Sequence, residues 1–400
     1  MTLRTLIFWP HLIAGATAGL VILIMSVTGV LLTYERQLIA WSDSGYRSVP
    51  PSSTSRLPVE ELLRAVQREH PELIPTAITI GAGPDAPVAL ALPQRTVYVD
   101  AYSARVLGEG SQGVRRAMSR LRAWHRWLAI EGEGRPVARA ITGWSNLLFL
   151  FIVVSGFYLW FPRRWSWQRV RPVVWFTRAS GKARDFNWHN TIGVWSAIPL
   201  AIVVASALPI SFPWANTLVY RIAGEEPPAA RARQAEGGNR EGGNREGGGR
   251  GDSRQDAAIP VEGLNAAWAV AEAHVPGWRS INVRLPQSGR APLVFAIDRG
   301  DGGQPQLRST LTVDRASSQI VSDETFATQG PGRRLRSLSR FAHTGEVLGI
   351  PGQTIAGVAT AGAVFLVWTG LALAWRRWRA WTKRRVLETA EPAVDQISAA

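Results

Sequence analysis

The chain has 400 residues, of which 46% are hydrophobic, and its formal net charge at pH 7 is +15. It contains no cysteine, which excludes cysteine-ligated iron–sulfur clusters, covalently attached c-type haem and disulfides. A strongly basic chain can indicate nucleic acid as a partner. Here the basic residues are concentrated in two short stretches beside apolar segments, so we expect no nucleic-acid partner.

Four long apolar segments organise the chain, at roughly 12–34, 137–161, 190–212 and 353–375. Each is close to the ~20 residues that a helix needs to cross a bilayer. The first is too long for the core of a signal peptide and has no evident cleavage site, so we expect an uncleaved span. The sequence therefore predicts a membrane α-helical fold, with a four-transmembrane-helix bundle in the lipid bilayer.

The two long connections between spans have a common order of elements. The first has a helical pattern from Pro58, followed by strand-like runs at 77–80, 88–92 and 96–99. The second has a helical pattern from Pro260 and strand-like runs at 281–285 and 293–297. Each predicts a small α+β module, closed by a turn in which Asp100 or Asp314 has a structural role. The Gly-rich repeat at 229–256 predicts a disordered spacer.

The basic residues predict the orientation of the chain. One group fills the loop between spans two and three, and another follows span four, which is the pattern of cytoplasmic segments. We therefore expect both termini in the cytoplasm and two periplasmic modules, in the inner membrane of a Gram-negative bacterium. The two groups are Arg163, Arg164, Arg169, Arg171, Arg178, Lys182 and Arg184, and then Arg376, Arg377, Arg379, Lys383, Arg384 and Arg385.

Four of the six histidines lie at or just before the start of a span: His11, His125, His189 and His343. When the segment from Trp188 is aligned without gaps with the first span, His189 falls on His11, Gly193 on Gly15 and Ser206 on Thr28. The predicted orientation of the chain puts His11 and His189 near the cytoplasmic face of the membrane, and His125 and His343 near the periplasmic face. Two imidazoles at each face predict the axial ligands of two haem b groups, one near each membrane face.

Other readings of these histidines remain open. A single interfacial histidine more often bonds to lipid headgroups, but two register-matched pairs favour metal ligation. Gly15 and Gly193, one helical turn after their histidines, would leave room for a porphyrin. Arg126 and Arg340 would pair with haem propionates. We expect local hydrogen bonds at the two remaining histidines, His70 and His274.

The chain resembles the PepSY-associated transmembrane proteins, a family that includes inner-membrane ferric-siderophore reductases. The motifs that carry the resemblance are WPH at Trp9, WHN at Trp188, Ser155-Gly156 and Thr369-Gly370 before tryptophans and paired arginines, and the two modules that run from PVE to VD. The resemblance covers nearly the whole chain. It departs at Ser206-Ala207, where the family has Thr-Gly, and in the Gly-rich insert.

This resemblance implies a haem-dependent oxidoreductase of iron acquisition that reduces a periplasmic ferric siderophore, or another ferric chelate, from Fe(III) to Fe(II). Quinol or a cytoplasmic reductase would supply the electrons. We expect no fused flavin reductase domain, which some relatives carry. The alternatives are electron transfer to another periplasmic acceptor, and a ligand-binding, transport or sensor protein without a redox cofactor.

The expected organisation, in chain order, is transmembrane helix 1 (1–36), PepSY-like module 1 (37–120), an outer amphipathic segment with transmembrane helix 2 (121–162), a basic cytoplasmic loop (163–187), transmembrane helix 3 (188–214), PepSY-like module 2 with the Gly-rich insert (215–335), an outer amphipathic segment with transmembrane helix 4 (336–377), and a cytoplasmic tail (378–400).

Overall fold

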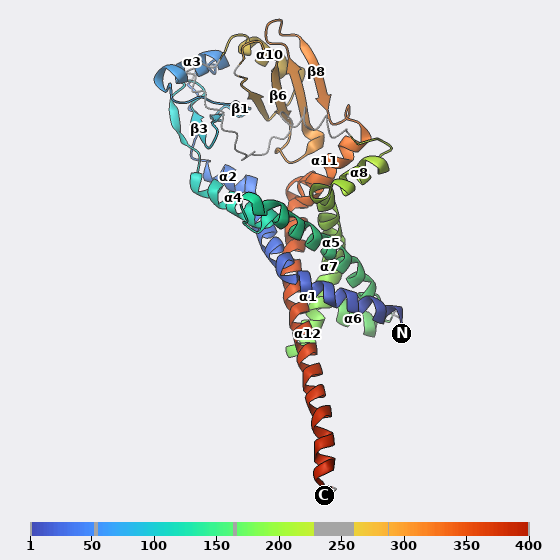
Figure 1. Cartoon of the computed structure of the whole chain (residues 1–400). Coiled ribbons are helices and arrows are strands. Elements are labelled where there is room, and N and C mark those ends of the chain that lie inside the picture. Colours follow the sequence, from blue (N-terminus) through green and yellow to red (C-terminus); the bar gives the residue numbers. More distant parts are fainter. Residues whose placement is uncertain (1, 52–54, 163–165, 228–259, 287, 399–400) are drawn as a thin grey trace. The chain divides into compact units, whose positions relative to one another are not determined.

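The computed structural model describes residues 2–51, 55–162, 166–227, 260–286 and 288–398 (Figure 1). The Gly-rich repeat at 229–256 lies outside the described residues, as do Arg163 and Arg164 of the basic loop. The chain divides into two compact units. The helical unit contains residues 1–35, 117–215 and 342–400, and the sheet unit contains residues 36–116 and 216–341.

Four long helices build the helical unit: α1 (Leu3–Leu32), α5 (Arg135–Trp160), α7 (Gly181–Ser211) and α12 (Gly349–Ser398). Each is long and apolar enough to cross a membrane. α1 packs against α5 and α12, and α7 packs against the same two helices. α1 and α7 therefore occupy diagonal positions in the bundle.

Small residues let these helices approach closely. A Cβ atom added to Gly362 of α12 would lie 3.1 Å from Ile192 of α7, and one added to Gly19 of α1 would lie 3.3 Å from Leu371 of α12. Large apolar side chains on the outside of the bundle, such as Ile198 and Trp368, are about two-thirds exposed, at 69% and 67%. An apolar exterior on long helices fits a lipid environment.

Shorter elements complete the connections. They are α2 (Glu35–Ser42), α4 (Gln112–Trp127), η1 (Gly132–Gly134), α6 (Trp167–Val174), α8 (Pro213–Ile222), α11 (Pro331–His343) and η3 (Glu346–Leu348). The two outer amphipathic segments expected from the sequence coincide with parts of α4 and α11, and each of these helices contains one of the paired histidines. α7 begins at Gly181 and α12 continues to Ser398, so both extend beyond their apolar segments.

An eight-stranded antiparallel sheet forms the sheet unit, in the order β4-β3-β2-β1-β5-β6-β7-β8. The pairing of β1 with β5, with Ile78 opposite Val283, joins its two halves. The α+β prediction is therefore confirmed, but the two halves share one sheet instead of forming separate modules. The strands are β1 (Ala77–Gly81), β2 (Val88–Ala91), β3 (Thr96–Val99), β4 (Val106–Glu109), β5 (Ser280–Arg284), β6 (Leu293–Asp298), β7 (Arg308–Val313) and β8 (Ile320–Thr325), with η2 (Pro305–Leu307) before β7.

Two helices, α3 (Val59–Glu69) and α10 (Leu264–His274), cover one face of the sheet. Alternate strand residues such as Leu90 and Phe295 point into this common core and are fully buried. The first turns of the two helices cap each other. The Glu60 amide donates to Asn265 Oδ1 at 3.0 Å, and the Asn265 amide donates to Glu60 Oε1 at 3.0 Å. This exchange satisfies one free helix-terminal amide on each side.

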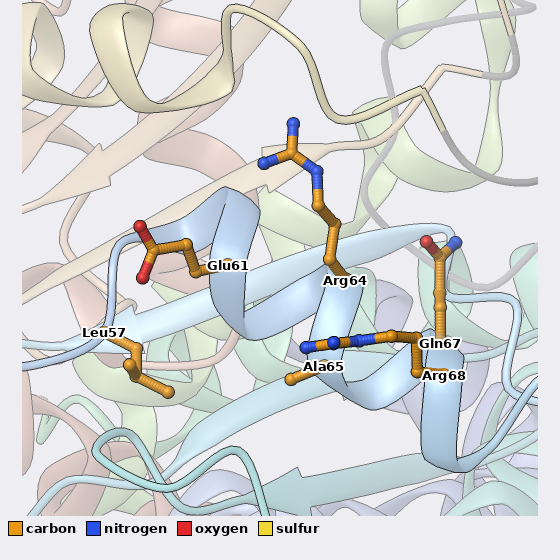
Figure 2. A pocket seen from close by; sticks show the side chains of 6 residues that line it. All are labelled: Leu57, Glu61, Arg64, Ala65, Gln67 and Arg68. Carbon is orange, nitrogen blue, oxygen red and sulfur yellow. The ribbon is translucent and has the colours of Figure 1, made fainter.

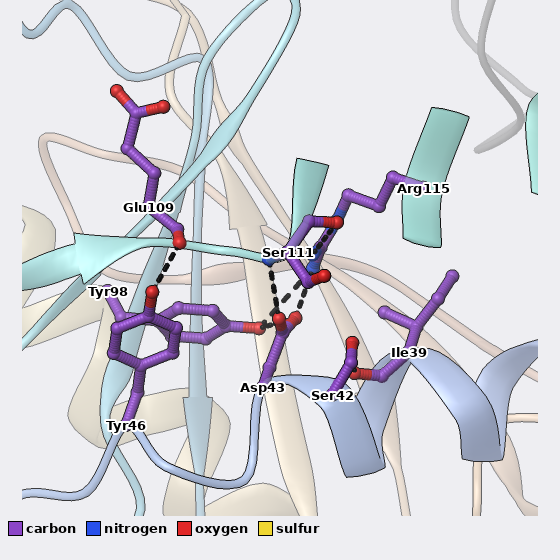
Figure 3. A network of polar contacts seen from close by, with 8 residues as sticks. All are labelled: Ile39, Ser42, Asp43, Tyr46, Tyr98, Glu109, Ser111 and Arg115. Atoms are coloured by element: carbon purple, nitrogen blue, oxygen red, sulfur yellow. Dashed lines mark hydrogen bonds and ion pairs between the residues drawn. The ribbon is translucent and has the colours of Figure 1, made fainter. Parts of the chain in front are cut away.

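A polar network ties the end of α2 and strand β3 to the start of α4 (Figure 3). The buried Asp43 carboxylate accepts hydrogen bonds from Arg115 at 2.6 Å, from the Ser111 amide at 2.7 Å and from the Tyr98 hydroxyl at 3.0 Å. Burial would raise the pKa of Asp43, but the hydrogen bonds from Arg115, Ser111 and Tyr98 outweigh it and hold this pKa below its usual value.

Asp100 and Asp314, which lie near the end of the first and the second half of the sheet unit, are turn residues, as expected. Asp100 Oδ1 accepts hydrogen bonds from the amides of Tyr102 and Ser103. Asp314 Oδ1 accepts a hydrogen bond from the Ser317 amide at 2.8 Å. Both carboxylates therefore stabilise the loops that carry them.

Candidate functional site

The four histidines predicted from the sequence all lie in the helical unit, where they form two pairs. His11 is in α1 and His189 is in α7, so the first pair comes from the two diagonal helices. They are near enough for their charges to interact. His125 near the end of α4 and His343 at the end of α11 form the second pair, with ring centroids 6.1 Å apart. All four side chains are half-buried.

Each of the four imidazoles is held through its Nδ1 atom by a neighbouring long helix. In the first pair, His11 Nδ1 lies 2.9 Å from Ser155 Oγ of α5, and His189 Nδ1 lies 3.0 Å from Thr369 Oγ1 of α12. Ser155 and Thr369 already donate their hydroxyl hydrogens to carbonyl groups of their own helices. Each hydroxyl oxygen is therefore placed to accept from the imidazole.

In the second pair, backbone carbonyl groups hold the rings. His125 Nδ1 donates to the Met25 carbonyl oxygen of α1 at 2.9 Å and lies 3.1 Å from Thr28 Oγ1. His343 Nδ1 donates to the Val203 carbonyl oxygen of α7 at 2.9 Å. A carbonyl oxygen accepts only, so both rings carry a hydrogen on Nδ1 and a lone pair on Nε2.

The Nε2 atoms are available to a ligand. Within the part of the chain that the structure describes, none of the four has a hydrogen-bond partner on Nε2. The second pair lies outside the four candidate spans. There, burial and then the charge of His343 lower the pKa of His125 to about 4, and burial also lowers the pKa of His343. Neutral imidazoles are the form that binds metal ions.

Three rings pack against a glycine that follows the hydroxyl residue of the partner helix. An added Cβ at Gly156 would lie 3.1 Å from His11 Cε1, one at Gly370 would lie 3.3 Å from His189 Cε1, and one at Gly29 would lie 3.4 Å from His125 Cε1. These glycines let the ring approach the backbone. Gly15 and Gly193, which the sequence singled out, have no such contact: a Cβ at Gly15 would meet nothing within 4 Å, and one at Gly193 would meet Leu366 at 3.7 Å.

The two pairs are separated by the same interval on both diagonal helices. Met25, which holds His125, comes fourteen residues after His11 on α1, and Val203, which holds His343, comes fourteen residues after His189 on α7. Fourteen residues are nearly four helical turns, or about 21 Å. On each diagonal helix, the carbonyl acceptor of the second pair therefore lies close to the face that carries the histidine of the first pair, and the interval is shorter than the thickness of a bilayer core.

The predicted cationic partners have aromatic neighbours. The Arg126 guanidinium lies 4.6 Å from the centre of the Trp127 ring, and the Arg340 guanidinium lies 5.7 Å from the centre of the Phe341 ring. Their pairing with propionates stays a prediction. At the other end of the bundle, the buried Asp185 forms ion pairs with Arg184 at 3.0 Å and with Arg376 of α12 at 2.7 Å.

In the described part of the chain, the other titratable residues form no metal cluster. Among the described residues, no group of three or more His, Cys, Asp or Glu side chains is close enough to hold a metal ion. The two remaining histidines have local partners, as expected: His70 bonds to Glu72 at 3.2 Å and His274 to Asp323 at 2.9 Å. Any bound centre that uses the first or second pair must therefore bring most of its own ligands.

A pocket of about 610 Å³ lies along α3 in the sheet unit (Figure 2). Its lining has mixed charge and contains none of the four paired histidines. The lining residues are Leu57, Glu61, Arg64, Ala65, Gln67 and Arg68.

Sequence reasoning missed the residues that orient the imidazoles. Ser155 and Thr369 were noticed only as parts of Ser-Gly and Thr-Gly motifs, and Thr28 only as the counterpart of Ser206. The signal was the recurrence of a hydroxyl residue followed by a small residue in all four spans. The carbonyl acceptors Met25 and Val203 carry no signal of their own, because every residue has a carbonyl group.

No curated protein matches the chain. A family model of the PepSY-associated TM region matches residues 8–377, which include α5, α7, most of α1, the apolar part of α12 and all four paired histidines. The chain is therefore a multi-pass membrane protein and belongs to the PepSY-associated transmembrane family.

Proposed function

We propose that this protein is an oxidoreductase of the bacterial inner membrane that holds two b-type haems and passes electrons to a ferric chelate, such as a ferric siderophore, in the periplasm. The observation that carries this proposal is the arrangement of the four histidines. They form two pairs about 21 Å apart along the bundle, and each ring has its Nδ1 fixed and its Nε2 without a partner among the described residues. This arrangement supports the proposal, because it would supply two imidazole donors to each of two metal centres.

The donor set fits haem better than a free metal ion. His125 and His343 would hold one iron between their Nε2 atoms, and metal–nitrogen bonds of about 2 Å would leave the two ring centres roughly 6 Å apart. The 6.1 Å between the rings of His125 and His343 supports such a pair. A porphyrin supplies four nitrogens itself, so no carboxylate or thiolate is needed nearby. His11 and His189 would hold the second haem.

When bound, haem supplies one-electron transfer at its iron. The residues of the chain would orient the axial imidazoles, and hydrogen bonds to Nδ1 strengthen imidazole as a ligand. Buried apolar side chains such as Ile22, Leu200 and Ala363 fill the bundle and exclude water from it. One electron from quinol or a cytoplasmic reductase would convert one Fe(III) chelate to Fe(II), which oxygen-rich chelators hold less tightly.

The distribution of charge supports the direction of transfer. Arg376, Arg377 and Arg379 follow the apolar part of α12, and basic residues of α6 and its flanks follow α5. Cytoplasmic segments have this excess of arginine and lysine. Both termini and the His11–His189 pair would then lie toward the cytoplasm, and the sheet unit would lie in the periplasm, where a ferric chelate arrives.

The test is a reduced-minus-oxidised visible spectrum of the full-length protein, purified from haem-replete cells, with haem quantified as the pyridine haemochrome. We expect low-spin b-type bands and about two haems per chain, one for each pair of axial imidazoles. His11→Ala and His125→Ala should each lose one haem and keep the other, and His343→Ala should remove the low-spin bands of one haem. His70→Ala, which changes a histidine of the sheet unit, is the control and should keep both.

A colourless wild-type protein would refute the redox function and favour a ligand-binding or transport protein. Loss of haem in the His70→Ala control would show that the pairs are assigned wrongly. An unchanged spectrum for His343→Ala would remove the second pair from the proposal.

A further inference from the structure

The two histidines of the second pair are held unequally. His125 Nδ1 has two partners on α1, the Met25 carbonyl oxygen at 2.9 Å and Thr28 Oγ1 at 3.1 Å. His343 Nδ1 has the Val203 carbonyl oxygen at 2.9 Å. Within the described residues, no hydroxyl group bonds to His343. Of the four paired histidines, it is therefore the one whose ring has no hydroxyl partner there.

The cause lies in the sequence of α7. In the register that places His189 on His11, Val203 corresponds to Met25, Ser206 to Thr28 and Ala207 to Gly29. The carbonyl acceptor is thus retained, but the Thr-Gly pair is replaced by Ser-Ala. The Ser206 hydroxyl donates to the Val203 carbonyl at 3.0 Å and has no bond to the imidazole.

The replacement of glycine by alanine is the second difference. Gly29 lies against His125, and a Cβ atom there would be 3.4 Å from the ring. This distance is the near limit of ordinary van der Waals contact, so a methyl group at this position would leave the ring no room to come closer to the helix. Ala207 carries that methyl group at the corresponding position of α7 and is buried.

The two histidines also differ in their places on the helix. α4 continues for two residues after His125, whereas His343 is the last residue of α11. Gly345 follows in the left-handed conformation, with φ +74°, which ends the helix. A terminal helical residue has fewer backbone hydrogen bonds around it and moves at a lower cost than an interior one.

We propose that His343 is the ligand of the second pair that can leave, and that its departure opens one coordination position to a small exogenous donor while His125 stays bound. The inference rests on the proposed function, since it assumes an iron held between these two rings. It assigns the open position to the His343 side. The first pair, with a hydroxyl partner and a glycine behind each ring, would stay closed.

The probe is carbon monoxide, added to the dithionite-reduced full-length protein. We expect it to bind one of the two haems, and to shift that part of the Soret band, while the other haem stays unchanged. The double variant Ser206→Thr/Ala207→Gly rebuilds the Thr-Gly pair behind His343. It should weaken carbon monoxide binding roughly fivefold, the factor that one added hydrogen bond contributes.

The opposite substitution on α1 tests whether the Ser-Ala pair makes an imidazole releasable. The variant Thr28→Ser/Gly29→Ala gives His125 the surroundings that His343 has in the natural chain, so its ring should also become releasable and carbon monoxide binding should strengthen. A magnetic circular dichroism spectrum of the oxidised protein gives a second readout, because a departing imidazole leaves a high-spin component.

Several outcomes would overturn the inference. Two haems per chain with neither binding carbon monoxide would leave the proposed function intact and refute a releasable His343. Equal binding by wild type and Ser206→Thr/Ala207→Gly would show that the Ser-Ala pair does not govern release. If the double variant loses haem altogether, the α1 variant Thr28→Ser/Gly29→Ala decides the question, and carbon monoxide binding that does not change there would refute the inference.

Discussion

A hydroxyl group on a neighbouring helix decides how an imidazole of the first pair presents its other nitrogen. Ser155 holds His11 and Thr369 holds His189, and both hydroxyl groups donate to their own helix, which leaves the oxygen to accept from Nδ1. Hydrogen bonding at Nδ1 increases the electron density at Nε2. In the proposed function, such a bond favours the ferric state and lowers the reduction potential of the bound iron.

Ser155→Ala should therefore raise the potential of one haem. Loss of one hydrogen bond of about 1 kcal/mol corresponds to a shift on the order of tens of millivolts for a one-electron couple. The measurement is a potentiometric titration followed in the visible spectrum.

Ser145→Ala is the matched control for Ser155→Ala. Ser145 lies on the same helix and is also buried, but no hydrogen bond connects it with any of the paired histidines among the described residues. Its potentials should match the wild type. A shift of equal size in both variants would mean that the change reports helix packing and not the His11 bond.

At this scale the sequence predicts the histidines but not what holds them. Their positions relative to the apolar segments, and the register shared by the first and third spans, were sufficient to pair His11 with His189 and His125 with His343. The partners Ser155, Thr369 and Val203 depend on which helices become neighbours. That arrangement results from packing of small residues over the whole bundle, which a local pattern does not encode.

At the scale of elements, the start of α4 depends on one buried carboxylate. The Asp43 carboxylate accepts hydrogen bonds from three groups: the Ser111 amide just before α4, the Arg115 guanidinium in the first turn of α4, and the Tyr98 hydroxyl of β3 (Figure 3). An anion at the N-terminus of a helix is also favoured by the helix dipole. The element that carries His125 is thereby fixed at its beginning.

Asp43→Asn should destabilise the protein by on the order of 3 kcal/mol, because it leaves a partly buried arginine without its charge partner. The measurement is the apparent unfolding temperature of the detergent-purified protein. Asp85→Asn is the control, since the Asp85–Arg47 pair is exposed and such pairs contribute little. Equal losses in the two variants would contradict a special role for Asp43.

The acid dependence follows from the sign of the pKa shift. The folded-state pKa of Asp43 is lower than its unfolded value, so its stabilising effect is complete above the unfolded pKa of about 3.9 and is lost as the pH falls through the folded pKa. The difference in stability between wild type and Asp43→Asn should therefore be constant from neutral pH to about pH 5 and shrink below pH 4.

The strands were predictable, but the single sheet was not. Alternation located β1, β2, β3, β5 and β6 within a residue or two of their observed ends. The pairing of Ile78 with Val283 joins segments about two hundred residues apart. The alternating pattern of β1 and β5 would look the same if each were the edge strand of a separate module. Only the complete structure shows that the two strands pair with each other and that the two halves share one core.

At the scale of the whole molecule, orientation in the membrane determines, in the proposed function, which pair would receive electrons and which would deliver them. The four helices and the family establish a multi-pass membrane protein. Orientation rests on the positions of the arginines, which predict that the end of α12 is cytoplasmic. If the orientation were reversed, the His11–His189 pair would face the periplasm, and a periplasmic ferric chelate would meet the pair in which both rings have a hydroxyl partner.

Single cysteines test the orientation directly, because the natural chain has none and gives no background labelling. Ala316→Cys lies in an exposed turn of the sheet unit and Ala380→Cys lies on the exposed part of α12 beyond its apolar segment. A membrane-impermeant maleimide added to intact spheroplasts should label Ala316→Cys and leave Ala380→Cys unlabelled until the cells are lysed. The opposite pattern would reverse the proposed direction of electron transfer. Labelling of both in sealed cells, with a cytoplasmic marker protected, would place the two positions on the same side and remove the basis for a path across the bilayer.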